Sequence, residues 1–234
     1  MTIDAVLFDC DGVLVDSEIV GLHDSAAYLR GEGFTYTPQD LVRLFTGKRD
    51  DRFRQELLEA YGRVLGRPPS DDEGEALFEG LLACRRRARD SMIAVPGALE
   101  TVTTVKKLGF GLAVASSSRQ VFLDSKMERY SFAPVVGRHV YSAEHVAHGK
   151  PAPDIFLHAA KRLGVSPREC LVIEDSPFGV EAGLAAGMTV WGFLGGGHCF
   201  EDHGERLLAA GAHELVDDHS SLKRRLISLR RNSA

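Results

Sequence analysis

The sequence predicts an α/β protein in which a parallel sheet, flanked by helices, is interrupted near its start by a helical insert. From residue 97 onward, short apolar segments alternate with segments of helical periodicity, as in parallel strands joined by crossover helices. Residues 17–92 carry helical periodicity and no convincing strand. We therefore expect an α/β core formed by residues 1–16 and 93–234, with the helical insert over residues 17–92.

The expected strands are short apolar runs. The first is Ala5-Val6-Leu7-Phe8, whose continuous apolar character is typical of a strand buried on both faces, and Gly12 marks the turn that follows it. Ser176 and Pro177 form an N-cap and first-turn pair that begins a helix after the fourth run. The expected strands cover residues 5–8, 111–116, 140–141, 170–174, 189–193 and 214–216.

In the insert, apolar residues recur at the spacing of helical turns. Pro96 and Gly97 mark the return to the alternating pattern of the core. The apolar faces expected there are Ile19, Leu22, Ala26 and Leu29, then Phe53, Leu57 and Leu58, then Leu77, Leu81 and Leu82.

The composition of the 234 residues excludes several classes of protein. A formal net charge of −5 gives no basic footprint for nucleic acid. The apolar runs are too short to span a membrane and the first residues do not resemble a signal peptide, so we expect a cytoplasmic protein without a membrane partner. The four cysteines lack any C-x-x-C spacing and are expected to be reduced thiols. The oligomeric state stays open, with a monomer as the expectation.

Two aspartates, Asp9 and Asp11, follow directly on the first strand. In open parallel sheets, ligands bind in the crevice outside the carboxyl ends of the strands. Two carboxylates placed there repel each other and lose hydration, so a divalent cation is the expected compensation. The alternative is a solvated turn in which both side chains cap the backbone.

Three further groups follow later strands. Ser116, Ser117 and Ser118 offer hydroxyls and backbone amides at the head of a helix, suited to phosphate oxygens, although serines there are also ordinary N-caps. Glu174-Asp175 ends the fourth strand, where the alternative role is to favour the helix dipole. Lys150 precedes a proline in a stiff loop; alone it would be a surface charge, but together with the carboxylates it suggests a site for phosphate.

In this order, these four pieces resemble the motifs of the haloacid dehalogenase superfamily of aspartyl-phosphate hydrolases. The resemblance spans residues 5 to about 197 and implies a Rossmann-like core with a helical cap inserted after the first motif, as in the branch of phosphoglycolate phosphatase and β-phosphoglucomutase. The form Phe8-Asp9-Cys10-Asp11-Gly12 and the glycine-rich turn with histidine are similar to 6-phosphogluconate-phosphatase-like relatives. The matching positions are Asp9-x-Asp11-Gly12-x-Leu14, Ser116, Lys150 and Glu174-Asp175.

The resemblance implies a role for each residue. Asp9 would attack phosphorus and become an aspartyl-phosphate, while Asp11 would act first as acid and then as base. Mg²⁺ would be held by Asp9, the Asp11 carbonyl and Asp175, with Glu174 farther out. Ser116, the Ser117 amide and Lys150 would hold the phosphoryl oxygens. The implied substrate is a small phosphorylated metabolite, such as a sugar or sugar-acid phosphate.

Two alternatives to a phosphatase stay open. A sugar phosphomutase of the β-phosphoglucomutase type shares the motifs. By the resemblance, such mutases have a histidine at the position of Gly21 and an arginine at the position of Asp50, so this chain departs from them at both. Arg119 and Gln120 likewise stand where they have lysine and asparagine. The other alternative is a phosphosugar-binding module without catalysis.

Two weaker features complete the candidates. Lys48, Arg49 and Arg52 in the insert, together with Arg119 in the core, are candidates to bind an anionic substrate, against the alternative of solvated charges. His198, Cys199 and His203 follow three glycines and have the chemistry of metal ligands, but no fourth partner is visible in the sequence.

Overall fold

The structure is a computed structural model that describes residues 2–45 and 50–232. The contacts between residues divide the chain into two compact units, one formed by Met1–Asp16 and Ile93–Ala234 and the other by Ser17–Met92. Within the described residues, none of the helices has the length and apolar character needed to cross a membrane.

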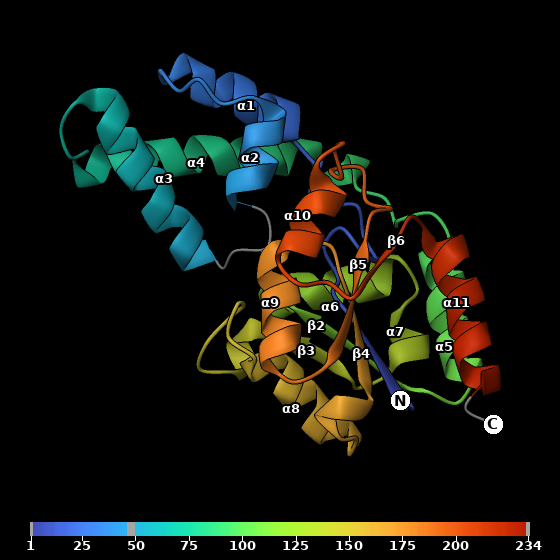
Figure 1. The fold of residues 1–234 in the computed structure, drawn as a ribbon. Helices are drawn as coiled ribbons and strands as arrows, with labels where there is room; N and C mark the ends of the chain where they lie inside the picture. The colour runs from blue at the N-terminus through green and yellow to red at the C-terminus, as the bar shows by residue number, and fades with distance from the viewer. Residues whose placement is uncertain (1, 46–49, 233–234) are drawn as a thin grey trace. The chain divides into compact units, whose positions relative to one another are not determined.

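The first unit is built on a six-stranded sheet in which every neighbouring pair is parallel (Figure 1). Its order, β3-β2-β1-β4-β5-β6, is that of the Rossmann-like doubly wound sheet, which confirms the predicted fold class. The chain builds outward from β1 on one side and then returns to β4 on the other. The strands are β1 (Ala5–Phe8), β2 (Gly111–Ser116), β3 (Val140–Ser142), β4 (Cys170–Glu174), β5 (Thr189–Phe193) and β6 (Glu214–Val216).

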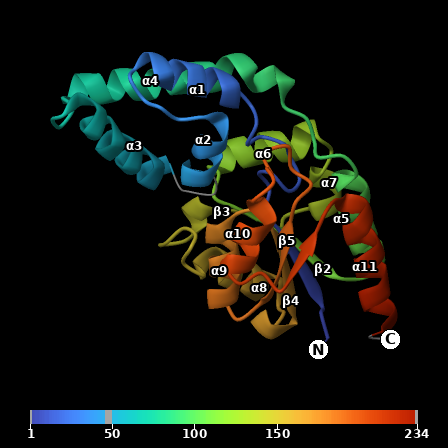
Figure 2. The same ribbon diagram turned by 45° about the horizontal axis from the view of Figure 1, so that its top comes forward.

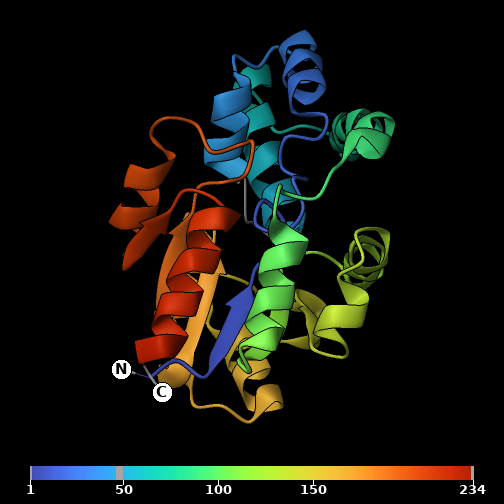
Figure 3. The same ribbon diagram turned by 90° about the vertical axis from the view of Figure 1, so that its right-hand side faces the viewer.

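Helices cover both faces of this sheet. α8 (Asp154–Leu163) and α9 (Pro177–Ala185) pack on one face, where Leu7, Ala113 and Val172 point toward them. α5 (Ala98–Lys107) and α11 (His219–Asn232) lie side by side against the other face (Figure 3). Burial of both faces explains why the strands read as continuous apolar runs. The remaining helices of this unit are α6 (Gln120–Arg129), α7 (Ala133–Val136), η2 (Ala143–His145), η3 (Pro167–Glu169) and α10 (His203–Ala209).

In its described residues the second unit is helical, and α1 and α4 lie along each other (Figure 2). Leu29, Leu57 and Leu77 are buried there as predicted. Phe53, Leu58 and Leu82 are partly buried. Ile19 is exposed at 38%, because α1 begins only at Leu22 and Ile19 precedes the helix. The helices are α1 (Leu22–Gly31), α2 (Pro38–Phe45), α3 (Asp50–Leu65), α4 (Asp71–Ala88) and η1 (Arg89–Ser91).

The buried His219 fixes the turn that follows β1. Its Nε2 lies 2.8 Å from the carbonyl oxygen of Val13 and, because a carbonyl only accepts, this nitrogen donates. The ring packs 4.6 Å from that of Phe193, and Thr101 Oγ1 donates to the His219 carbonyl. Burial lowers the pKa of His219 to about 4, although the hydrogen bond to Val13 acts in the opposite direction.

This lowered pKa predicts that stability falls as the pH falls. Between pH 6.5 and 4 the unfolded chain protonates His219 while the folded chain does not, so the free energy of unfolding decreases by about 3 kcal/mol from this residue. His219→Gln keeps a side-chain donor but does not titrate, and should therefore reduce the loss measured by urea unfolding between pH 7 and pH 4.5. The exposed His145→Gln serves as the control. Equal pH dependence in His219→Gln and the native protein would contradict this assignment.

Candidate active site

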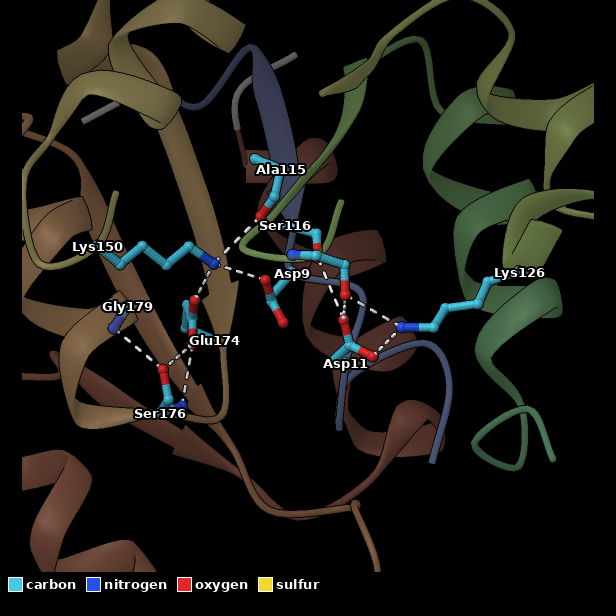
Figure 4. Close-up of polar contacts among 10 residues, drawn as sticks. Asp9, Asp11, Ala115, Ser116, Lys126, Lys150, Glu174, Ser176 and Gly179 are labelled. Carbon is cyan, nitrogen blue, oxygen red and sulfur yellow. Dashed lines mark hydrogen bonds and ion pairs between the residues drawn. The ribbon is translucent and has the colours of Figure 1, made fainter. Parts of the chain in front are cut away.

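Most of the predicted site residues lie at the carboxyl edge of the sheet, around the central strands β1, β2 and β4, and Figure 4 shows Asp9, Asp11 and Lys150 among them. The register aligns Phe8 of β1 with Val114 of β2 and with Ile173 of β4, so the residues that follow these positions emerge side by side. Gly12, with φ at +78°, then turns the chain away from the sheet in a conformation that disfavours other residues. The edge therefore collects Asp9, Ser116 and Glu174 from three strands.

Lys150 joins the three strand ends. Its Nζ donates to Asp9 Oδ1 at 2.5 Å, to Glu174 Oε1 at 2.5 Å and to the carbonyl oxygen of Ala115 at 3.1 Å. These three acceptors satisfy all three N–H groups of the buried ammonium. Burial alone would lower the pKa of Lys150, but the charges of Asp9 and Glu174 outweigh it and raise that pKa above its usual range. Lys150 is therefore a fixed positive charge at the end of β1.

The environment of Asp9 disfavours its charged form, in contrast to that of Lys150. Burial raises the pKa of its carboxyl to about 7, Lys150 partly offsets this, and the charges of Glu174 and Asp11 raise it further. Cys10, the next residue, is fully buried, and burial raises the pKa of its thiol well above its usual value, so it stays protonated at neutral pH. Asp9 is thus a carboxylate whose ionised form needs more positive charge than Lys150 alone supplies.

The Asp11 carboxylate is held toward β2 and α6. Ser116 Oγ donates to its Oδ2 at 3.2 Å and Ser118 Oγ donates to the same atom at 2.7 Å. Lys126 of α6 forms an ion pair with its Oδ1 and donates to Ser118 Oγ. The sequence reasoning missed Lys126, and it assigned the Ser118 hydroxyl to phosphate oxygens and not to Asp11. The available signal was that Lys126 lies three residues after the buried Leu123, on the same side of α6.

Both oxygens of Glu174 are engaged within the protein. Oε1 accepts from Lys150, while Oε2 accepts from the backbone N and the Oγ of Ser176. Ser176 Oγ also accepts from Gly179 N, which confirms the predicted N-cap of α9. A Cβ on Gly179 would lie 1.8 Å from Glu174 Oε1, so this carboxylate packs directly on the helix backbone. The contacts of Glu174 therefore hold Lys150 and the start of α9.

Asp175 is buried beside the turn after β1. A Cβ on Gly12 would lie only 1.8 Å from Asp175 Oδ2, so the carboxylate rests on the Gly12 backbone. Its Oδ2 also lies 2.9 Å from His198 Nε2. The carbonyl oxygen of Asp175 lies 2.6 Å from His203 Nε2, and burial lowers the pKa of His203 to about 4, so this neutral ring donates Nε2–H. The sequence had suggested the two histidines only as metal ligands.

The remaining candidates lie elsewhere. Arg119 is exposed and its Nε lies 3.4 Å from Glu144, so the structure does not bring it into the cluster. Arg52 pairs with Glu56 on the surface of α3. Lys48 and Arg49 lie outside the described residues. Ser117 Oγ is buried and, within the part of the chain that the structure describes, makes no hydrogen bond.

The donor chemistry of this edge fits a divalent cation of the magnesium type. The candidate ligands are hard oxygen atoms, namely the carboxylates of Asp9 and Asp175 and the carbonyl of Asp11, as Mg²⁺ prefers. Burial, together with the charges of Glu174 and Asp11, raises the pKa of Asp9, and a cation beside this carboxyl would favour its ionised form. The ligand atoms of His198, Cys199 and His203 lie within 4.8 Å of one another, but this set offers softer nitrogen and sulfur.

Several known proteins are similar to this chain over most of its length. Residues 3–187 match the family described as haloacid dehalogenase-like hydrolase. SUPPRESSOR OF QUENCHING 1 of Arabidopsis thaliana is 38% identical over 186 residues, which cover 80% of this chain. Hexitol phosphatase A of Escherichia coli is 31% identical over 185 residues, 79% of this chain and 80% of that protein. The chain spans 17% of the first relative and 47% of a second Arabidopsis relative, a bifunctional riboflavin kinase/FMN phosphatase.

A solved structure agrees over nearly the whole chain. It is a hydrolase of the same family from Deinococcus radiodurans R1, crystallised with bound phosphate and sodium. It superposes with a TM-score of 0.79 at 34% identity and covers 97% of this chain and 96% of its own.

The buried ammonium is expected to dominate the stability of this edge. Lys150→Met keeps the apolar stem but leaves Asp9 and Glu174 buried without their shared cation, so the free energy of unfolding at pH 8 should fall by about 3–5 kcal/mol. The measurement is urea unfolding followed by circular dichroism in EDTA. Lys223→Met, which removes a surface pair with Glu100, is the matched control and should leave stability unchanged. Equal effects of the two changes would disprove the structural role of Lys150.

Proposed function

The chain belongs to the haloacid dehalogenase-like hydrolase family, and from this premise we propose that it is a magnesium-dependent phosphatase of small phosphomonoesters that works through an aspartyl-phosphate. The observation that carries the proposal is the junction of Lys150 with Asp9, at the strand edge where Asp11 is also held. Support also comes from the related Deinococcus hydrolase, which binds phosphate.

In the first step, a carboxylate oxygen of Asp9 attacks phosphorus while the bond from phosphorus to the ester oxygen of the substrate breaks. Asp11, protonated, donates its proton to the departing alkoxide. Asp9 is suited to the attack because it is fixed through Oδ1 by Lys150 and its place at the end of β1 is set by the sheet. The product of this step is an alcohol and an acyl phosphate on Asp9.

In the second step, Asp11 accepts a proton from a water molecule as that water attacks the same phosphorus. The bond from phosphorus to Asp9 breaks, which releases inorganic phosphate and restores the carboxylate. The two hydroxyls and the ammonium around Asp11 hold its carboxylate in place as the base of this second step. An acid two residues after the nucleophile is useful because the leaving group is an oxygen that needs a proton.

The transferring phosphoryl group carries negative charge that this edge must stabilise. The charge of Lys150, the backbone amide of Ser117 and the Ser116 hydroxyl, which would exchange its hydrogen bond to Asp11 for one to the substrate, are proposed to stabilise this negative charge. Preorganised electrostatic groups of this kind supply most of the catalysis in phosphoryl transfer. The buried hydroxyl of Ser117 is a further donor at the same strand end. Asp9, Asp175 and the Asp11 carbonyl would hold Mg²⁺, which supplies charge neutralisation at the phosphoryl oxygens and at Asp9. Glu174 acts by holding Lys150.

The proposed substrate class is a sugar or sugar-acid phosphate. Hexitol phosphatase A, which this chain resembles over most of its length, supports a phosphorylated polyol or sugar. Arg49 stays a candidate for an anionic end of the substrate, whereas the surface pair with Glu144 makes Arg119 a weaker one. Gly21 and Asp50, at positions where mutases carry other residues, favour hydrolysis over phosphomutase activity.

The test is release of inorganic phosphate from p-nitrophenyl phosphate and a panel of sugar phosphates, with Mg²⁺ or with EDTA. We expect turnover that requires Mg²⁺ and that Asp9→Asn lowers at least about 10³-fold, because the nucleophile is lost. The exposed Asp124→Asn is the matched control and should retain activity.

Three results would contradict the proposal. Activity that survives Asp9→Asn would exclude this nucleophile. Conversion of β-glucose 1-phosphate to glucose 6-phosphate, with a bisphosphate activator and little free phosphate, would indicate a mutase. Binding of sugar phosphates without turnover in Mg²⁺ would indicate a binding module.

A further inference from the structure

The loop between β5 and α10 reaches the proposed metal ligand Asp175. His198 in this loop is fully buried, and its Nε2 lies 2.9 Å from Asp175 Oδ2. His203, the first residue of α10, places its Nε2 2.6 Å from the carbonyl oxygen of the same residue. The two rings meet edge to face, with centroids 5.1 Å apart. One aspartate is therefore held by two histidines, at its side chain and at its backbone.

Close backbone packing fixes the loop that carries these histidines. A Cβ on Gly196 would lie 2.6 Å from the carbonyl oxygen of Gly12, so the loop lies directly on the turn after β1. A Cβ on Gly12 would in turn lie 2.6 Å from His198 Cε1. Gly197 N donates to Asp16 Oδ1 at 3.0 Å, which anchors the loop at a second point. The glycines thus allow the His198 ring to reach Asp175.

We propose that His198 and His203 are positioning residues that hold the Asp175 carboxylate in the orientation required to bind the divalent cation. This inference rests on the proposed function. A carboxylate turns about its side-chain bonds unless a second contact fixes it, and partners of this kind around a metal ligand typically change metal affinity about 10–100-fold. His198 Nε2 lies against the Asp175 carboxylate and His203 Nε2 donates to the Asp175 carbonyl, which favours positioning over a separate metal site at His198, Cys199 and His203.

The test is Mg²⁺ binding by isothermal titration calorimetry, together with the Mg²⁺ dependence of phosphatase activity. His198→Gln can place an amide N–H near the position of Nε2, whereas the shorter His198→Asn cannot. We expect His198→Asn to raise the Mg²⁺ dissociation constant about 10–100-fold and His198→Gln to recover most of the affinity. At saturating Mg²⁺, kcat of both variants should return to within about threefold of the native value, because the reacting groups are unchanged.

Two controls separate positioning from other effects. His139→Ala removes a partly buried histidine immediately before β3, whose Nδ1 lies 2.8 Å from Tyr141 Oη, and should leave Mg²⁺ binding unchanged. Cys199→Ser should leave Mg²⁺ affinity unchanged. A loss in Cys199→Ser as large as that in His198→Asn would show that the cluster itself binds the metal, and would overturn the inference.

The outcomes distinguish this inference from the function on which it rests. If the native protein binds Mg²⁺ and folded His198→Asn binds it equally well, the positioning role is wrong while the phosphatase proposal stands. If His198→Asn does not fold, His198→Gln decides: native affinity supports the role, and affinity as weak as that of Asp175→Asn overturns it. If the native protein neither binds Mg²⁺ nor hydrolyses phosphate esters, both proposals fall.

Discussion

The junction of Lys150 with Asp9, Glu174 and the Ala115 carbonyl is the interaction on which the rest of this edge depends. A buried ammonium is tolerated only when its charge and all its donors are satisfied, and here the three partners come from the ends of β1, β4 and β2. Their meeting requires β1 to lie between β2 and β4 in register, which the sheet order provides. The register of the central strands therefore determines whether Lys150 can contact its three partners.

The charge balance of the edge explains why it suits a cation and an anion together. Four carboxylates, those of Asp9, Asp11, Glu174 and Asp175, share the edge with the ammoniums of Lys150 and Lys126. Burial and the neighbouring carboxylates raise the pKa of Asp9 to about 7, so its ionised form is disfavoured in the protein alone. A divalent cation would offset that cost, and the fixed ammoniums and hydroxyls would then face the phosphoryl oxygens.

Much of this arrangement could be predicted from sequence because parallel strands are short, apolar and followed by polar residues at one edge. The six strands, the N-cap at Ser176 and the meeting of Asp9 with Lys150 and Glu174 follow from that pattern. Lys126 could not be found in this way, because a helical lysine is ordinarily solvated and its contact with Asp11 spans 115 residues. The ligand chemistry of the His198 side chain could be predicted from sequence, but its partner Asp175 could not, because only the folded glycine loop brings the two within reach.

The contacts around Asp9, Asp11 and Asp175 described above all lie within the first unit, so the sheet and its loops assemble this cluster without the insert. Residues of the insert that recognise the rest of a substrate could then vary without disturbing the proposed reacting groups Asp9 and Asp11, provided that the connection between the two units leaves Asp175 in place. Asp16, at that connection, is hydrogen-bonded to the loop between β5 and α10 that carries His198. Asp16 N donates to the Ile93 carbonyl where the chain leaves and re-enters the core, and Asp16 Oδ1 accepts from Gly197, next to His198. A displacement of Asp16 would therefore act on the loop that contacts Asp175, which makes this junction a constraint on the proposed metal ligand as well as on the chain path.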